Sequence, residues 1–160
     1  MDMNELKFPK KKTTSIKKYQ KLCDDIFSLF TRLRDSDENG YGNCFTCNRL
    51  GHFIKMDCGH FIKRQYLPTR YDEKNCNMQC KPCNHFEQGL NEVYEKRINE
   101  KYGAETTKTL MIKKWNKSAL YRFEYSLLIR HYQFKILELM QTKQFQLAPH
   151  YLKLLKEIIK

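Results

Sequence analysis

Two Cys-x-x-Cys pairs are the residues of this 160-residue chain whose types and spacing point most directly to chemistry. The first pair is Cys44 and Cys47, and the second pair, after 32 intervening residues, is Cys80 and Cys83. Each pair makes a turn that directs two sulfurs toward one point, and two such turns complete the tetrahedral shell of four thiolates that zinc prefers. The sequence therefore predicts a structural Zn²⁺ site, with the intervening residues folded between the two turns.

Three further cysteines bring the total to seven. An odd number of cysteines, with no secretory signal at the start of the sequence, disfavours a secreted disulfide framework and favours an intracellular, reducing compartment. Cys23 falls on the apolar face of a predicted helix, where a small buried residue is expected. Cys58 or Cys76 could replace one of the four zinc ligands, and His52 could do so if a cysteine is free, so these alternatives stay open.

A second group of residues has the composition of a hydrolytic site. His60 closes the segment Asp57-Cys58-Gly59-His60, and Asn84 follows the second cysteine pair directly. A neutral histidine can accept a proton from water, and an asparagine carbonyl oxygen is a hard ligand suited to Mg²⁺ or Mn²⁺. Zinc would hold His60 and Asn84 close together, because it would join the predicted strand to the predicted helix. His85 is the substitute ligand for the divalent ion if Asn84 is only a helix cap.

The charge of the chain indicates a polyanionic partner. Thirty Lys and Arg against eighteen Asp and Glu give a net charge of +12, which favours nucleic acid. Arginines beside the predicted base can neutralise phosphate charge, so the parts needed for metal-assisted phosphodiester hydrolysis are present. The residues expected to contact DNA are Lys63, Arg64 and Arg70 in a loop, and Lys10, Lys11 and Lys12 in an N-terminal arm.

The elements that must position these residues are predicted from hydrophobic periodicity. Helical spacing extends over residues 15–34, and an alternating, glycine-containing segment at 44–62 favours a β-hairpin. Residues 67–70 are predicted to be a loop. A helix is expected to begin near Pro82, with an interruption at Gly89, and to stop at Gly103. Three more helices are expected at 105–115, 118–142 and 149–159.

Together these elements predict an α+β fold that is mostly helical, with a zinc-clamped core and flanking helices. The expected domains are a flexible basic arm at 1–13, a zinc-stabilised domain at 14–115 and a C-terminal helical extension at 116–160. No segment is apolar enough to span a bilayer, so neither a membrane partner nor a location outside the cytoplasm is expected.

The helix at 118–142 carries an apolar stripe that predicts either core packing or a dimer interface. A homodimer through residues 118–160 would suit a task on two strands. The residues of the stripe are Leu120, Phe123, Leu127, Leu128, His131, Phe134, Leu137 and Met140. A short repeat also occurs, since Gly51-His52-Phe53-Ile54-Lys55 recurs as Gly59-His60-Phe61-Ile62-Lys63. Because His52 and His60 occupy the same position of this repeat, either could fill a role that is assigned to one of them.

The order of these motifs resembles the HNH, or ββα-metal, nucleases and more closely the phage lambda NinG (Rap) family of recombination endonucleases. The similarity runs from about residue 15 to residue 115. It rests on Thr31-Arg-Leu-Arg-Asp35, Cys44-Phe-Thr-Cys47, Met56-Asp-Cys-Gly-His-Phe61, Thr69-Arg-Tyr-Asp-Glu-Lys-Asn75 and Gln79-Cys-Lys-Pro-Cys-Asn84. Gly89, Tyr94 and Tyr102-Gly103 continue the resemblance.

The resemblance implies cleavage of branched DNA, such as Holliday junctions and D-loops, with structural Zn²⁺ and catalytic Mg²⁺ or Mn²⁺. It implies that His60 activates the attacking water, that Asn84 holds the divalent ion and that Asn75 braces the loop. Arg64 would contact the phosphate at the catalytic site. Asp57 would be a further metal ligand, although on a regular strand its side chain points away from that of His60.

Two readings without chemistry remain open. A zinc-stabilised module that only binds nucleic acid would have the same charge and the same cysteines. A structural or assembly protein would account for the C-terminal helices but not for the residues between the cysteine pairs.

Overall fold

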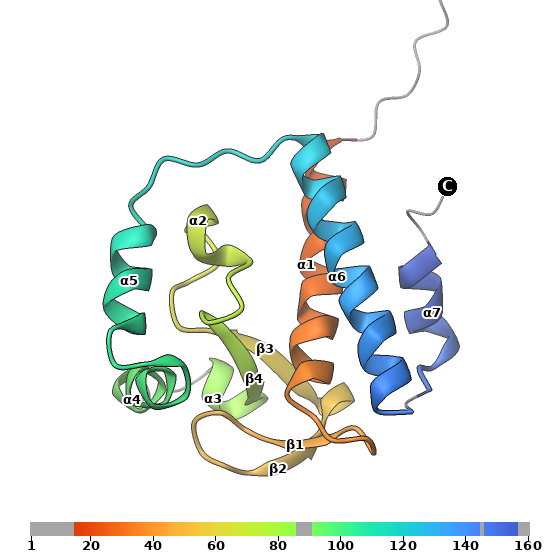
Figure 1. Ribbon diagram of the computed structural model, residues 1–160, viewed down its shortest axis with the longest axis horizontal. Coiled ribbons are helices and arrows are strands. Elements are labelled where there is room, and N and C mark those ends of the chain that lie inside the picture. The colour runs from red at the N-terminus through yellow and green to blue at the C-terminus, as the bar shows by residue number, and fades with distance from the viewer. Residues whose placement is uncertain (1–14, 86–90, 145, 157–160) are drawn as a thin grey trace, which may run out of the picture.

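The structure, a computed structural model, describes residues 15–85, 91–144 and 146–156 (Figure 1). The predicted arm at 1–13, with Lys10, Lys11 and Lys12, and the predicted interruption at Gly89 lie outside these residues. The elements are α1 (Ile16–Arg34), β1 (Tyr41–Asn43), β2 (Leu50–His52), β3 (Met56–His60), α2 (Leu67–Arg70), β4 (Cys76–Cys80), α3 (Lys81–His85), α4 (Asn91–Tyr102), α5 (Thr106–Lys113), α6 (Arg122–Thr142) and α7 (Pro149–Lys156). The fold is α+β, with far more helix than strand, as the sequence predicts.

Helix α1 is the centre of the larger hydrophobic core. Its apolar residues recur every three or four positions, so Cys23, Ile26, Phe27 and Phe30 share one buried face. Cys23 is completely buried, which confirms its predicted packing role. Helix α6 lies alongside α1, and α7 lies beyond α6 (Figure 1).

The strands pair differently from the hairpin predicted over residues 44–62, and that prediction is wrong. Strand β2 pairs antiparallel with the preceding strand β1, and Gly42 lies opposite Gly51. The first cysteine pair therefore lies in the turn between these two strands. A single 3-10 turn at 53–55 then redirects the chain, and β3 pairs antiparallel with β4. Sequence alternation identified the strands but not their partners, because partner choice depends on residues distant in sequence.

The β3–β4 ribbon is covered on both faces. Met56 and Met78 belong to the core around α1, whereas Tyr94 of α4 donates a hydrogen bond to the Gly59 carbonyl at 2.9 Å from the other side. A Cβ atom on Gly59 would lie 1.8 Å from the Gln79 side-chain oxygen, so any larger residue here would have to displace the Gln79 side chain. The smaller core under α4 and α5 consists of Ile62, Tyr94, Ile98 and Leu110.

The helices after the second cysteine pair follow the predicted order. Helix α3 covers Lys81–His85, and α4 ends at Tyr102, where Gly103 adopts a φ of +109°. Residues 67–70, predicted to be a loop, instead form the short helix α2. Its proline lies in the first turn, where a backbone N–H has no partner within the helix, so the proline is tolerated there. Helices α5, α6 and α7 lie within the ranges predicted for them.

The predicted apolar stripe of α6 enters the core only in part, through the partly buried side chains of Leu120, Leu128 and Met140. Tyr125, Ile129, Tyr132 and Ile136 are buried against the rest of the protein. The stripe residues Phe123, Leu127, Phe134 and Leu137 are exposed. Since α6 is apolar on more than one face, periodicity could not decide which face packs on α1.

The predicted C-terminal extension shares its core with the rest of the chain. Ile129, Leu147 and Leu155 belong to the same cluster of buried residues as Phe27 of α1. In the part of the chain that the structure describes, no helix has both the length and the apolar character needed to cross a membrane.

Candidate active site and metal centre

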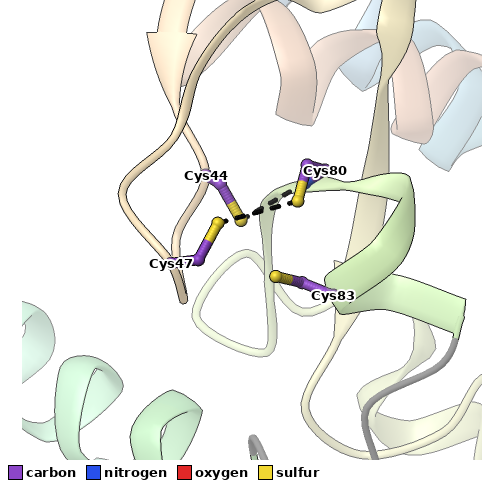
Figure 2. Close-up of side chains that lie close together, drawn as sticks. All are labelled: Cys44, Cys47, Cys80 and Cys83. Atoms are coloured by element: carbon purple, nitrogen blue, oxygen red, sulfur yellow. Dashed lines mark hydrogen bonds between the residues drawn. The ribbon is translucent and has the colours of Figure 1, made fainter.

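The four cysteines of the two Cys-x-x-Cys pairs converge on one point (Figure 2). Their sulfur atoms all lie within 4.8 Å of one another, and the Cys47 and Cys80 sulfurs are 3.7 Å apart. Zn–S bonds of about 2.3 Å in a tetrahedron place neighbouring sulfurs about 3.8 Å apart. The four cysteines could therefore hold a structural metal ion such as zinc.

Local hydrogen bonds prepare these thiols for a cation. Burial opposes ionisation of Cys44, but bonds from the Thr46 hydroxyl and from backbone N–H groups outweigh it and lower the pKa of Cys44 to about 6. Burial, together with the neighbouring thiols, raises the pKa of Cys83 to about 12. Four thiolates cannot coexist here without a positive charge between them, and a divalent cation supplies it.

The metal centre joins two parts of the fold that are distant in sequence. Cys44 and Cys47 lie in the β1–β2 turn, whereas Cys80 ends β4 and Cys83 lies in α3. A bound ion would fix the start of α3 against that turn.

Three polar side chains meet at the last described residues of α3. The Asp57 carboxylate lies 3.1 Å from the Asn84 amide nitrogen and 3.1 Å from the His85 Nε2 atom. An amide nitrogen and oxygen are exchanged by a flip of the Asn84 side chain, which would present the oxygen instead. Carboxylate, amide oxygen and imidazole are ligands for divalent ions such as Mg²⁺ and Mn²⁺.

A single cavity of about 830 Å³ connects this group to the predicted base. Asp57, His60 and Asn84 all line it, although Asp57 and His60 leave opposite faces of β3, as strand alternation predicts. Lys63 and Arg64 also line the cavity and are exposed, so their charges are available to an anionic ligand.

His60 is oriented by backbone oxygens. Its Nε2 atom lies 3.1 Å from the Arg70 carbonyl oxygen, and its Nδ1 atom lies 3.3 Å from the Cys58 carbonyl oxygen. Burial, with smaller contributions from Arg64 and Arg70, lowers the pKa of His60 to about 4, so its ring is neutral at pH 7. A neutral ring has one N–H group, and the shorter contact favours its placement on Nε2, which leaves the Nδ1 lone pair to accept a proton.

Asn75 ties together the loop that supplies the Arg70 carbonyl. Its side-chain oxygen accepts from the Ile62 N–H at 2.8 Å, and its amide donates to the carbonyls of Ile62 at 3.0 Å and Thr69 at 2.9 Å. Asn75 is fully buried, and all three bonds stay within the loop. These hydrogen bonds hold the segment between Ile62 and Asn75 together, which is compatible with the bracing role that the resemblance implies.

Arg70 is engaged inside the protein. Its guanidinium donates two hydrogen bonds to the Asp24 carboxylate of α1, at 2.8 and 2.5 Å. Only about 16% of the Arg70 side chain is exposed. A phosphate contact by Arg70 would require this ion pair to open, whereas Lys63 and Arg64 need no such change.

The end of α1 holds β4 through residues whose role the sequence did not indicate. Arg34 pairs with Asp35 and donates to the Cys76 carbonyl at 2.8 Å, while Asp35 accepts from the Met78 N–H at 2.9 Å. These partners lie more than forty residues apart in sequence, so no local pattern marks them.

A second group of possible metal ligands lies on the face of β3 and β4 that packs on α1. The ligand atoms of Cys58, His60 and Cys76 all lie within 4.8 Å of one another. A hydrogen bond with the Cys76 thiol, helped by the Thr31 hydroxyl and opposed by burial, lowers the pKa of Cys58, whereas burial raises the pKa of Cys76. His52 belongs to neither group and instead caps the 3-10 turn by accepting from the Ile54 N–H.

The family model described as the bacteriophage lambda NinG protein matches residues 1–142. The match covers both cysteine pairs, the residues of the cavity and the whole of α6. No curated protein and no solved structure matches the chain.

Proposed function

Because the chain belongs to the NinG family, we propose that it is a divalent-metal-dependent endonuclease that cleaves branched DNA during phage recombination. Family membership supports the connection with phage recombination. The observation that carries the chemistry is the shared cavity, which is lined by His60, by the Asp57–Asn84 pair and by two exposed basic residues.

The order of elements around the cavity supports a ββα-metal core of the HNH type. Strands β3 and β4 are antiparallel and are followed at once by α3. The base would come from the end of β3 and the metal ligands from β3 and α3. The four-cysteine centre would fix the position of α3, and so the geometry between the base and the ligands.

The donors on α3 and on the neighbouring strand β3 suit a catalytic Mg²⁺ or Mn²⁺ ion. Asp57 would hold the ion together with Asn84 or His85, since both lie within 3.1 Å of its carboxylate. A bound ion would polarise a phosphate oxygen and stabilise the charge that develops on it. Lys63 and Arg64, at the exposed part of the cavity, would hold the flanking phosphates.

His60 would act as the general base. Its neutral ring and its Nε2 contact with the Arg70 carbonyl leave Nδ1 to take a proton from the attacking water. The Asn75 hydrogen bonds would keep the Arg70 carbonyl in place. The histidine would then be oriented before substrate binds, which lowers the cost of reaching the reactive geometry.

The deciding experiment compares two histidines of the same short repeat. We expect His60→Ala to lower cleavage by about 10² to 10⁴ while keeping DNA affinity and fold, because a positioned acid–base group contributes about that much. His52→Ala, which removes an imidazole with no place in the cavity, should leave cleavage near wild type.

The measurement uses labelled four-way, forked and linear DNA with Mg²⁺, Mn²⁺ or EDTA. The alternative, a zinc-stabilised module that only binds nucleic acid, is favoured by one observation: both ring nitrogens of His60 face backbone oxygens. It predicts DNA binding without cleavage in wild-type protein. Equal cleavage by His60→Ala and wild-type protein would remove the proposed mechanism.

A further inference from the structure

Cys58, His60 and Cys76 form a second set of soft ligands outside the four-cysteine centre. His60 stands directly opposite Cys76 in the β3–β4 register, and Cys58 lies two residues before His60 on the same face of β3. Their ligand atoms lie within 4.8 Å of one another, the same limit that the four-cysteine centre meets. Two thiolates and an imidazole match the donor preference of Zn²⁺ and of related thiophilic ions.

The surroundings of this cluster also fit an anionic, metal-bound thiolate. The Thr31 hydroxyl is fully buried beside the Cys58 sulfur, and no other group among the described residues hydrogen-bonds to it. A Cys58 thiolate would accept a hydrogen bond from this hydroxyl. An ion binding here would displace the thiol protons of Cys58 and Cys76 to solvent.

The cluster can be reached from the cavity. Cys58 and His60 both line the cavity, while Cys76 closes the cluster from the buried side. Three protein ligands on one side and solvent on the other would leave a fourth position for water.

We propose that Cys58, His60 and Cys76 form a second metal site for a thiophilic divalent ion such as Zn²⁺, and that its occupation silences the active site. The silencing half of this proposal rests on the proposed function of His60. A neutral imidazole that binds an ion through one ring nitrogen carries its proton on the other, so His60 cannot bind an ion and accept a proton from water at the same time.

The binding half is tested without DNA, on full-length protein whose four-cysteine centre holds zinc. Cd²⁺ is added stepwise, and native mass spectrometry counts the zinc and cadmium ions bound to each protein molecule. The cadmium NMR shift then distinguishes a site with two sulfur ligands and one nitrogen ligand from a site with four sulfur ligands. We expect wild-type protein to hold one more metal ion than before, with a cadmium signal from two sulfur ligands and one nitrogen ligand, whether or not Cd²⁺ also replaces zinc in the four-cysteine centre. Cys58→Ser and Cys76→Ala should each lose that added ion.

Cys23→Ala is the matched control, because it removes a buried thiol that belongs to neither group. It should bind the added Cd²⁺ as wild type does. Two variants are used because replacing the buried Cys76 could disturb folding more than replacing the partly exposed Cys58. Circular dichroism tests whether each variant is folded. The site is refuted if wild-type protein gains no added ion, or if folded Cys58→Ser and Cys76→Ala both keep it.

The silencing half is tested on four-way DNA with Mn²⁺ and increasing Cd²⁺. Wild-type cleavage should fall as the added site fills, and Cys76→Ala should resist the same Cd²⁺ concentration. Inhibition that is equal in both proteins would overturn the silencing role while leaving the binding result to stand. Absence of cleavage in wild-type protein without Cd²⁺ would instead count against the proposed nuclease function.

Discussion

At the residue scale, His60 and Asp57 show how burial and local contacts set the chemistry of single side chains. His60 is partly buried beside Phe27, and this burial outweighs the backbone oxygens that favour the charged ring, so its neutral form is favoured. Asp57 keeps partial exposure and meets Asn84 and His85 of α3. The proposed proton acceptor and the proposed ion ligand thus lie on one strand, three residues apart.

The lowered pKa of His60 predicts a pH-dependent stability. Below its ordinary pKa near 6.5 the unfolded chain protonates this histidine, whereas the folded protein does so only near pH 4, so acid favours unfolding. Between pH 7 and pH 5 we expect a loss on the order of 2 kcal/mol that His60→Ala does not show. Urea unfolding of both proteins at each pH measures the difference, and acid loss of zinc affects both alike. Parallel curves would contradict the prediction.

Removal of the Asp57 carboxylate should weaken the divalent ion site. In Asp57→Asn the charged ligand is lost while side-chain volume is kept, so we expect Mn²⁺ affinity to fall about tenfold or more. Electron paramagnetic resonance of free Mn²⁺ during titration reports the affinity. Asp25→Asn, which removes a carboxylate paired with Lys21 on α1, is the control and should bind Mn²⁺ as wild type does. An unchanged Mn²⁺ affinity in Asp57→Asn would show that Asp57 is not a ligand of the ion.

At the scale of elements, β4 is fixed at both of its ends. Arg34 and Asp35 at the end of α1 bond to the backbone of Cys76 and Met78, and the four-cysteine centre lies where β4 meets α3. Both faces of the β3–β4 ribbon are also covered by helices. The start of α3 is therefore positioned by contacts from three distant parts of the chain.

Loss of the metal centre should unfold this region first. We expect Cys80→Ser to bind no zinc and to lose amide protection in β4 and α3, since structural zinc contributes about 10 kcal/mol or more of apparent binding energy in small domains. Hydrogen exchange and metal analysis measure the two effects. Cys23→Ala is again the control. A zinc-free Cys80→Ser protein with native protection in β4 would show that the ion is not structural.

At the scale of the whole molecule, α6 has two apolar faces, of which one is buried and the other is exposed to solvent. One face packs on α1 and unites the C-terminal helices with the rest of the core. The other face leaves Phe123, Leu127, Phe134 and Leu137 exposed. An exposed apolar stripe of this kind suits a contact with a second copy of the chain, which keeps the predicted homodimer open to test.

A charge in the exposed stripe should prevent self-association. Phe134→Glu places a carboxylate on a residue that is 72% exposed, so we expect a folded monomer with nearly unchanged unfolding free energy. Ile112→Glu makes the same kind of change at a residue of α5 that is also 72% exposed, and it should keep the wild-type association state. Sedimentation equilibrium measures both. A wild-type monomer, or a dimer that survives Phe134→Glu, would argue against this interface.

The sequence by itself determined the features that depend on local spacing and residue type. The helical repeat of α1 placed Cys23 in the core, and the two Cys-x-x-Cys pairs marked the metal centre before any fold was known. Spacing suffices in these cases because a helix turn and a two-cysteine turn are each built from residues adjacent in the chain.

Only the tertiary structure decided which distant residues meet. It paired β3 with β4 instead of β2, engaged Arg70 with Asp24, chose the buried face of α6 and brought Cys58, His60 and Cys76 together. Each of these outcomes depends on packing between segments far apart in sequence. Which faces pack together depends on the shapes of both partners, so a local pattern of residues in one segment does not predict it.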